Sequence, residues 1–342
     1  MKTLTIGDLK ARIPIIQGGM GVGISLSGLA SAVANEGGIG VISAAGLGLL
    51  YKKLSPSNYT EAGNLGLAEE IRKAREKAKG IIGVNVMVAL SDFAELVKTS
   101  IAEKVDIIFS GAGLPLDLPS FLKKDSVTKL VPIVSSARAV RIICEKWKNN
   151  YDYLPDAVVL EGPKAGGHLG YKENQLEDQH FSLEELLPQV VEEVSHFEQK
   201  YDKKIPVIAA GGIYTGEDIK RMIDLGASGV QLGTRFVTTT ECDASEAFKQ
   251  TYIQAEEKDI EIIKSPVGMP GRAIHCSFLE KVKAGIKQPK ACPFNCIKTC
   301  DISRSPPYTT LSKVISRMDT LSPAVTLGER IRSLRYGKPL PS

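Results

Sequence analysis

The feature that most constrains this chain is a series of eight short, β-branched apolar runs, each bounded by glycine or by polar turn residues. The runs occupy residues 13–17, 40–43, 81–85, 106–110, 130–135, 157–161, 205–210 and 229–233. Near-continuous apolar runs are typical of strands that are buried on both faces of a parallel sheet, whereas half-exposed strands alternate apolar and polar residues. The series therefore predicts eight buried parallel strands.

Most intervals between the runs carry the period of an amphipathic helix. Val140, Ile143 and Trp147, for example, fall on one stripe of residues 137–150. Similar patterns occupy residues 67–79, 183–201 and 216–225. Eight strand–helix repeats within residues 1–240 predict an α/β fold, a (β/α)8 TIM barrel. A doubly wound sheet is the competing architecture, which the strand count alone does not exclude.

Two segments break the repeat. Residues 46–66 follow the second run as a long connection, which indicates a functional loop or a lid. Beyond residue 240 the repeat stops, and the amphipathic pattern of residues 244–258 predicts a mainly helical C-terminal extension over 241–342. Because a closed barrel cannot add a ninth strand, we expect this extension beside the barrel mouth. There it is free to cover a ligand or to form a subunit contact, of which a homodimer is the commonest kind.

Charge and length exclude several classes of protein. The 43 basic and 39 acidic residues give a net charge of +4 and are interspersed, which argues against nucleic acid as a partner. No apolar run reaches the roughly 18 residues of a membrane helix, so we expect no membrane contact. Residues 1–10 lack an apolar signal core, and six cysteines in 342 residues are not a disulfide framework. We therefore expect a cytoplasmic protein with a small-molecule substrate.

Glycines and polar residues gather where the predicted strands end, which is where parallel α/β folds bind ligands. Residues 17–23 follow the first strand, Asn85 ends the third, and residues 161–168 follow the sixth. The seventh strand runs into Gly211-Gly212, and the eighth into residues 231–234. Glycines there let backbone N–H groups approach an anion, so these two turns predict a phosphate cradle. Any single glycine pair is equally consistent with a tight turn, but several pairs at strand ends favour the cradle.

Other nucleotide motifs are missing from the sequence. Residues 18–23 do not match G-x-G-x-x-G, and no acidic residue ends a strand about 20 positions later. No G-x-x-x-x-G-K-[ST] occurs anywhere in the chain. These observations exclude a P-loop ATPase and disfavour a Rossmann dehydrogenase.

His168 differs from the other three histidines in its position. It follows a glycine pair just past a strand end, where an imidazole could reach a ligand and move a proton near neutral pH. A solvated loop histidine is the simpler alternative for His168. It is the interpretation that we give to His180, His196 and His275, which lie in polar or helical stretches.

Cys292, Cys296 and Cys300 are spaced by four, so a continuous helix would align three thiols. Three thiolates could hold a metal or an iron–sulfur cluster, but a fourth ligand is not evident and Pro293 disturbs the first turn. We therefore assign no metal site, and expect these cysteines to be dispensable for the chemistry at His168.

The strand-end motifs together resemble the nitronate monooxygenase family, once called 2-nitropropane dioxygenases. The resemblance rests on Ala165-Gly166-Gly167-His168, on Ala209-Ala210-Gly211-Gly212-Ile213 and on Gly229-Val230-Gln231-Leu232-Gly233-Thr234, in this order, and extends over residues 5–275. It implies a TIM barrel that binds FMN, with His168 as the catalytic residue. The cofactor-binding residues that it implies are Gln17, Gly18, Gly19, Met20, Asn85, Glu161, Ala165, Gly166, Gly167, Gly211, Gly212, Gln231, Leu232, Gly233 and Thr234. The tail after Asp301 lacks the family's glycine-containing closing segment.

The resemblance implies one preferred activity and a close rival. The preferred activity is oxidation of a nitronate, or of a nitroalkane deprotonated by His168, with O2 to a carbonyl compound and nitrite. The rival keeps the fold and FMN but takes electrons from NAD(P)H and reduces an enoyl-ACP or a quinone. A barrel that only binds a phosphorylated metabolite is the alternative from another class.

Overall fold

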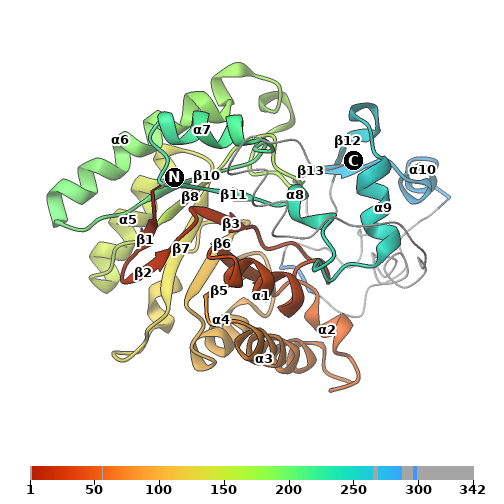
Figure 1. Cartoon of the computed structure of the whole chain (residues 1–342), viewed down its shortest axis with the longest axis horizontal. Helices are drawn as coiled ribbons and strands as arrows, with labels where there is room; N and C mark the ends of the chain where they lie inside the picture. The colour runs from red at the N-terminus through yellow and green to blue at the C-terminus, as the bar shows by residue number, and fades with distance from the viewer. Residues whose placement is uncertain (1, 56, 265–268, 287–295, 299–342) are drawn as a thin grey trace.

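The eight predicted strands form and close into one parallel barrel (Figure 1). The computed structural model describes residues 2–55, 57–264, 269–286 and 296–298. In barrel order the strands are β3 (Ile15–Gln17), β4 (Ile39–Ser43), β5 (Ile81–Met87), β6 (Ile107–Gly111), β7 (Lys129–Val134), β8 (Val158–Glu161), β10 (Val207–Ala210) and β11 (Gly229–Leu232), which pairs with β3 again. The TIM-barrel prediction is confirmed, and the doubly wound alternative is wrong.

Helices surround the barrel between most successive strands, and a short 3-10 helix (Leu118–Phe121) takes this place between β6 and β7. They are α1 (Ser27–Asn35), α2 (Leu47–Leu50), α3 (Tyr59–Lys77), α4 (Phe93–Ala102), α5 (Ala137–Tyr151), α6 (Leu183–Tyr201), α7 (Gly216–Asp224) and α8 (Thr234–Val237). The four predicted helices correspond to α3, α5, α6 and α7, but α3 begins earlier than expected, and α3 and α7 end one or two residues before the predicted ends. The apolar side chains of the strands accordingly form two separate clusters. Those that face inward fill the barrel, and those that face outward pack beneath the helices.

The prediction of a long loop over residues 46–66 is wrong, because most of this segment is helical in α2 and the start of α3, and its role as a lid stays a prediction. Its glycines permit close helix packing instead of forming a loop. A Cβ added to Gly66 would lie 2.5 Å from the Tyr51 ring, and one added to Gly48 would lie 2.3 Å from the Tyr59 carbonyl oxygen. Asn58 caps α3 by accepting a hydrogen bond from the Glu61 N–H at 3.1 Å.

A short N-terminal hairpin covers the amino-terminal end of the barrel. Its strands are β1 (Leu4–Ile6) and β2 (Leu9–Ala11), which pair antiparallel. Leu4, Ile6 and Ala11 are buried in the same cluster as the inward-facing barrel residues. This end is therefore filled with apolar side chains, which leaves the opposite, carboxyl-terminal end for a ligand.

The described part of the extension contains the predicted helix in a shorter form, a second helix and an unpredicted sheet. Its elements are α9 (Glu246–Gln254), β12 (Ile260–Lys264), β13 (Pro270–Ile274) and α10 (Ser277–Lys283). Strands β12 and β13 form a hairpin that pairs with β9 (Gly167–His168) outside the barrel. Because β13 begins with proline and glycine, its sequence resembles that of a loop. Figure 1 shows this hairpin with α9 on one side of the barrel, away from α5 and α6. No described helix has the length and apolar character needed to cross a membrane.

A buried carboxylate stabilises the start of α1. Glu70 of α3 is 3% exposed, accepts a hydrogen bond from the Ser27 N–H at 2.6 Å, and accepts another from the Tyr51 hydroxyl. We expect Glu70→Ala to lower the free energy of unfolding by about 2–4 kcal/mol, because it leaves two buried donors without an acceptor. Urea unfolding measures this loss. An unchanged midpoint would show that water replaces the carboxylate at no cost.

The same residue predicts a pH dependence of stability. Burial alone would raise the pKa of Glu70, but hydrogen bonds from Tyr51 and Ser27 outweigh it, and the pKa is lowered. A carboxyl group with a lowered pKa in the folded state stabilises the fold above its unfolded pKa of about 4.3, and this contribution disappears as the pH falls through the folded pKa. The stability difference between the wild type and Glu70→Gln should therefore be full at neutral pH and shrink below about pH 4.

Candidate functional site

The barrel register places two polar side chains at one level of the carboxyl-terminal end. Glu161 of β8 pairs with Ala210 of β10, which pairs with Gln231 of β11. Val159 and Ile208, two residues before Glu161 and Ala210, belong to the interior cluster. Side chains alternate along a strand, so Glu161 and Gln231 face the inside of the barrel mouth. Burial raises the pKa of Glu161 to about 7.

The turns after β10 and β11 lie where the sequence predicts a cradle of backbone N–H groups. Gly211 and Gly212 have φ values of +93° and +76°, and a Cβ on Gly211 would lie 2.9 Å from the Gly162 carbonyl oxygen. Among the described residues, the N–H groups of Gly212, Gly233 and Thr234 donate to no protein group. Three unpaired donors beside two left-handed glycines are suited to hold an anionic group.

The segment after β3 lies across the strand ends. The Gly18 N–H donates to the Leu232 carbonyl at 2.8 Å, which ties this segment to the end of β11. Gly19 packs directly on Asn85, since an added Cβ would lie 2.3 Å from the Asn85 Cβ. Met20 lies near Gly233, whose added Cβ would be 3.4 Å from the Met20 sulfur. The structure therefore brings these predicted residues together at one rim.

Gln17 has a different position from the other predicted residues. Its side chain is fully buried, its Oε1 accepts from the Val41 N–H at 2.9 Å, and its Nε2 donates to the Gly18 carbonyl. Strands β3 and β4 are paired only at Ile16 and Ile39, so this side chain substitutes for the missing ladder bonds. The Gln17 side chain is thus engaged within the barrel wall, and only its backbone adjoins the site.

His168 lies on the rim, in the two-residue strand β9. It is half-buried, and burial lowers its pKa below the ordinary histidine value. A lowered pKa keeps the imidazole neutral near pH 7, which is the form that can accept a proton. The neighbouring Gly166 and Gly167 border open space, since a Cβ added to either would meet nothing within 4 Å. The site therefore combines a half-buried imidazole of lowered pKa with a glycine-lined opening.

Sequence reasoning missed Arg272, which reaches this rim from the extension. Its Nη1 donates to the Pro163 carbonyl at 2.6 Å and to the Ala165 carbonyl at 2.8 Å. Arg272 and Pro163 are 109 positions apart, and no local pattern connects them. The only signal in the sequence is an arginine that follows a Pro-Gly pair just after the βα repeat has ended.

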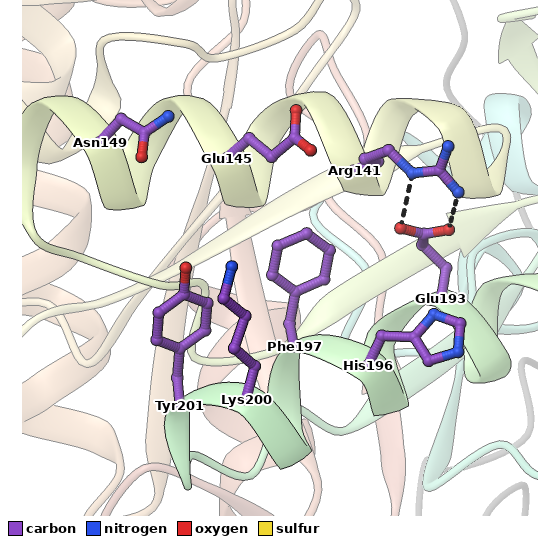
Figure 2. A pocket seen from close by; sticks show the side chains of 8 residues that line it. All are labelled: Arg141, Glu145, Asn149, Glu193, His196, Phe197, Lys200 and Tyr201. Atoms are coloured by element: carbon purple, nitrogen blue, oxygen red, sulfur yellow. Dashed lines mark hydrogen bonds and ion pairs between the residues drawn. The ribbon is translucent and has the colours of Figure 1, made fainter.

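Away from the barrel mouth, an open groove of about 350 Å³ lies between α5 and α6 in the outer helical layer (Figure 2). Arg141 and Glu193 form a bidentate ion pair across it, with N–O distances of 2.9 and 2.5 Å. His196 lines this groove, and no predicted site residue does. His180 and His275 pair with nearby carboxylates on exposed surface. These three histidines lie outside the candidate site, as predicted.

The cysteine motif is described only at Cys296, and Cys292 and Cys300 lie outside the described residues. The Cys296 carbonyl accepts from the Ser91 N–H at 3.1 Å, and Ile297 bridges to Leu90 after β5. In the described part of the chain, no three histidine, cysteine or acidic side chains gather as a metal site. Cys144 and Cys242 are buried thiols whose pKa values burial raises to about 12 and about 11, so neither is a nucleophile near neutral pH.

Comparison with known proteins extends these observations. A model of the nitronate monooxygenase family matches residues 2–305. A protein of Staphylococcus aureus (strain Newman), named "Probable nitronate monooxygenase", is 30% identical, with 80% of this chain and 78% of that protein covered. The structure of FabK from Thermotoga maritima superposes with a TM-score of 0.61 at 29% identity, covering 80% of this chain and 74% of that one.

Another relative carries a different name at similar identity. It is the "(3aS,4S,5R,7aS)-5-hydroxy-7a-methyl-1-oxo-octahydro-1H-indene-4-carboxyl-CoA dehydrogenase" of Mycobacterium tuberculosis, 28% identical over 272 residues. The match covers 80% of this chain but only 66% of that protein, and a Rhodococcus jostii protein of the same name is covered over 65%. Names thus diverge among relatives of equal similarity, so identity alone does not select a substrate.

Proposed function

Since this chain belongs to the nitronate monooxygenase family, we propose that it is an FMN-dependent oxidoreductase that converts nitronates and nitroalkanes with O2 into carbonyl compounds and nitrite. The observation that carries the proposal is His168, a half-buried imidazole with a lowered pKa beside a glycine-lined opening. A base of this kind is what a neutral nitroalkane requires, because its carbon-bound proton must leave before oxidation.

The residues at the mouth fit a phosphorylated flavin. The donors of Gly212, Gly233 and Thr234 would hold the phosphate, and a side chain on Gly211 or Gly212 would fill the space between β10 and the 162–165 loop. Residues 18–20 and Asn85 would lie against the ring, with Gly166 and Gly167 at its edge. When bound, FMN supplies the redox chemistry by accepting electrons from the organic substrate and passing them to O2.

The protein's own contribution is to bind the substrate and to move one proton. The His168 imidazole accepts the proton from the α-carbon of the nitroalkane, which leaves a nitronate anion in the site. The open space at Gly166 and Gly167 admits a small substrate beside His168. A pre-formed nitronate has already lost this proton and bypasses the step.

The lowered pKa of His168 predicts the pH dependence of turnover. Burial disfavours the charged imidazolium, so the neutral base persists to lower pH than in an ordinary histidine with a pKa of about 6.5. We expect kcat/KM for a neutral nitroalkane to rise with pH and to reach half its plateau below about pH 6.5. Steady-state kinetics between pH 5 and 8 measures this, and a midpoint above 6.5 would contradict the assignment.

Anaerobic mixing of the purified holoprotein with candidate donors tests the proposed activity. Bleaching of the flavin absorbance by a nitronate, and not by NADH or NADPH, is the expected result. Rapid bleaching by NADH or NADPH would instead favour a reductase of enoyl-ACP or quinone substrates. Protein that carries no flavin and takes up no FMN on reconstitution would overturn the proposal in favour of a barrel that only binds a phosphorylated ligand.

A further inference from the structure

The strand that carries His168 is held from outside the barrel. Strand β9 is two residues long and pairs with β13, with His168 opposite Gly271 and Gly167 opposite Arg272. The Leu169 N–H adds a hydrogen bond to the Pro270 carbonyl at 2.9 Å. The position of His168 therefore depends on a hairpin of the extension.

Residues 162–166 lead into this strand and contain a hydrogen bond from the Ala165 N–H to the Gly162 carbonyl at 3.2 Å. Gly166 and the first strand residue, Gly167, have no side chains to pack, and Gly167 has a φ of +74°. Glycine restricts the backbone less than any other residue, so contacts from elsewhere must fix the course of this loop. On the barrel side of the two glycines, Arg272 supplies such contacts through Pro163 and Ala165.

The environment of Arg272 indicates that its guanidinium serves to make these two hydrogen bonds. The guanidinium is half-buried, its pKa is lowered by burial, and no ion pair with a carboxylate is found for it among the described residues. A partly buried cation without an anion is costly unless strong hydrogen bonds compensate. Within the described part of the chain, its partners are two backbone carbonyls from one loop.

We propose that Arg272 is a positioning residue: by fixing the carbonyls of Pro163 and Ala165, it holds the Gly166–Gly167 segment and, through it, His168 in place at the barrel mouth. The inference deepens the proposed function, because it rests on His168 acting as the base. It makes the C-terminal extension part of the site, although the βα repeat that builds the barrel ends before it.

Loss of this contact should release the loop and admit water to His168. The charged groups on the adjoining elements are Arg272 on β13, Lys164 on the loop and Glu161 at the end of β8, and burial is the cause of the lowered His168 pKa. Greater hydration of the imidazole raises its pKa toward about 6.5, and removal of the Arg272 charge acts in the same direction. Arg272→Lys keeps the charge and separates the two effects.

The experiment is an NMR titration of the imidazoles in the full-length holoprotein, in wild type, Arg272→Met and Arg272→Lys. The chain has four histidines, and the spectrum of His168→Asn identifies the relevant signal. We expect the His168 midpoint to rise in Arg272→Met and to return partly in Arg272→Lys. In parallel, kcat/KM for a neutral nitroalkane should fall about 10- to 100-fold in Arg272→Met, with a much smaller loss for a pre-formed nitronate.

Arg141→Met is the matched control, because Arg141 also forms two short hydrogen bonds but lies in the groove between α5 and α6 (Figure 2). It should leave the His168 midpoint unchanged. An unchanged midpoint in folded Arg272→Met, or an equal shift in Arg141→Met, overturns the proposal. If Arg272→Met does not fold, an Arg272→Lys midpoint equal to that of the wild type, with wild-type kinetics on both substrates, overturns it. The titration uses no substrate, so its result does not depend on the proposed activity. If the wild type fails to oxidise nitronates, only the proposed function is overturned, and the role of Arg272 in positioning His168 is still tested by the titration.

Discussion

Replacement of His168 by asparagine should lower kcat/KM for a neutral nitroalkane by about 10²- to 10⁴-fold, the range typical of a lost general base. Asparagine is similar in size and keeps hydrogen-bonding capacity, but it cannot accept a proton near pH 7. Turnover of a pre-formed nitronate should fall by no more than about tenfold, because its proton has already been removed. Steady-state kinetics with both forms of one substrate measures the difference.

His196→Asn is the matched control for this substitution. His196 lies in the groove between α5 and α6, in the outer helical layer (Figure 2), and its replacement should leave both activities unchanged. Equal losses on nitroalkane and nitronate in His168→Asn would remove the role of His168 as base and would leave it a binding role. The flavin content of each variant must be measured first, so that a loss of cofactor is not counted as a loss of proton transfer.

Gly211→Ala should weaken the binding of FMN at least about 100-fold. The substituted residue would be strained at a φ of +93°, and its Cβ would lie 2.9 Å from the Gly162 carbonyl oxygen and 3.1 Å from the Ala165 N–H nitrogen. Both neighbours are backbone atoms, which cannot rotate away as a side chain can. The clash must therefore displace either the 162–165 loop or the turn that carries the Gly212 N–H. Strain of this kind costs on the order of 1–3 kcal/mol, and displaced N–H donors add to the loss of phosphate binding. Quenching of flavin fluorescence during titration with the apoprotein measures the affinity.

Gly226→Ala separates strain from loss of the cradle. Gly226 also has a positive φ, of +106°, but it precedes β11 at the amino-terminal end of the barrel. Both substitutions should lower thermal stability, whereas only Gly211→Ala should reduce FMN affinity. Retention of wild-type affinity in Gly211→Ala would show that the phosphate lies elsewhere.

The positions of the strands and of most site residues follow from local patterns. Runs such as 157–161 and 205–210 are apolar throughout, because a barrel strand is covered on both faces, and this pattern is readable without any partner. Once such strands are parallel, their carboxyl ends must meet at one rim. Glu161, Gly211 and Gln231 could therefore be predicted together, although their mutual register comes only from the structure.

Two features required the tertiary structure. Gly48 and Gly66 resemble loop residues in the sequence, but they are glycines because α2 and α3 pack closely. Gln17 resembles a ligand-binding residue, but its side chain completes the pairing between β3 and β4. In each case the residue type is explained by a neighbour that lies elsewhere in the chain.

By itself the sequence determined the eight buried strands, the glycine-lined rim and the place of His168 along it, because each depends on hydrophobic periodicity or on residues next to a strand end. That the strands close into a barrel rather than a doubly wound sheet was decided by the pairing of β11 with β3. Only the tertiary structure decided what holds His168. Strand β13 is too short and too rich in proline and glycine to show a period, and its pairing with β9 depends on the shape of the rim that receives it. Arg272 acquires its partners only through that pairing, since backbone carbonyls are present at every residue and leave no mark in a sequence.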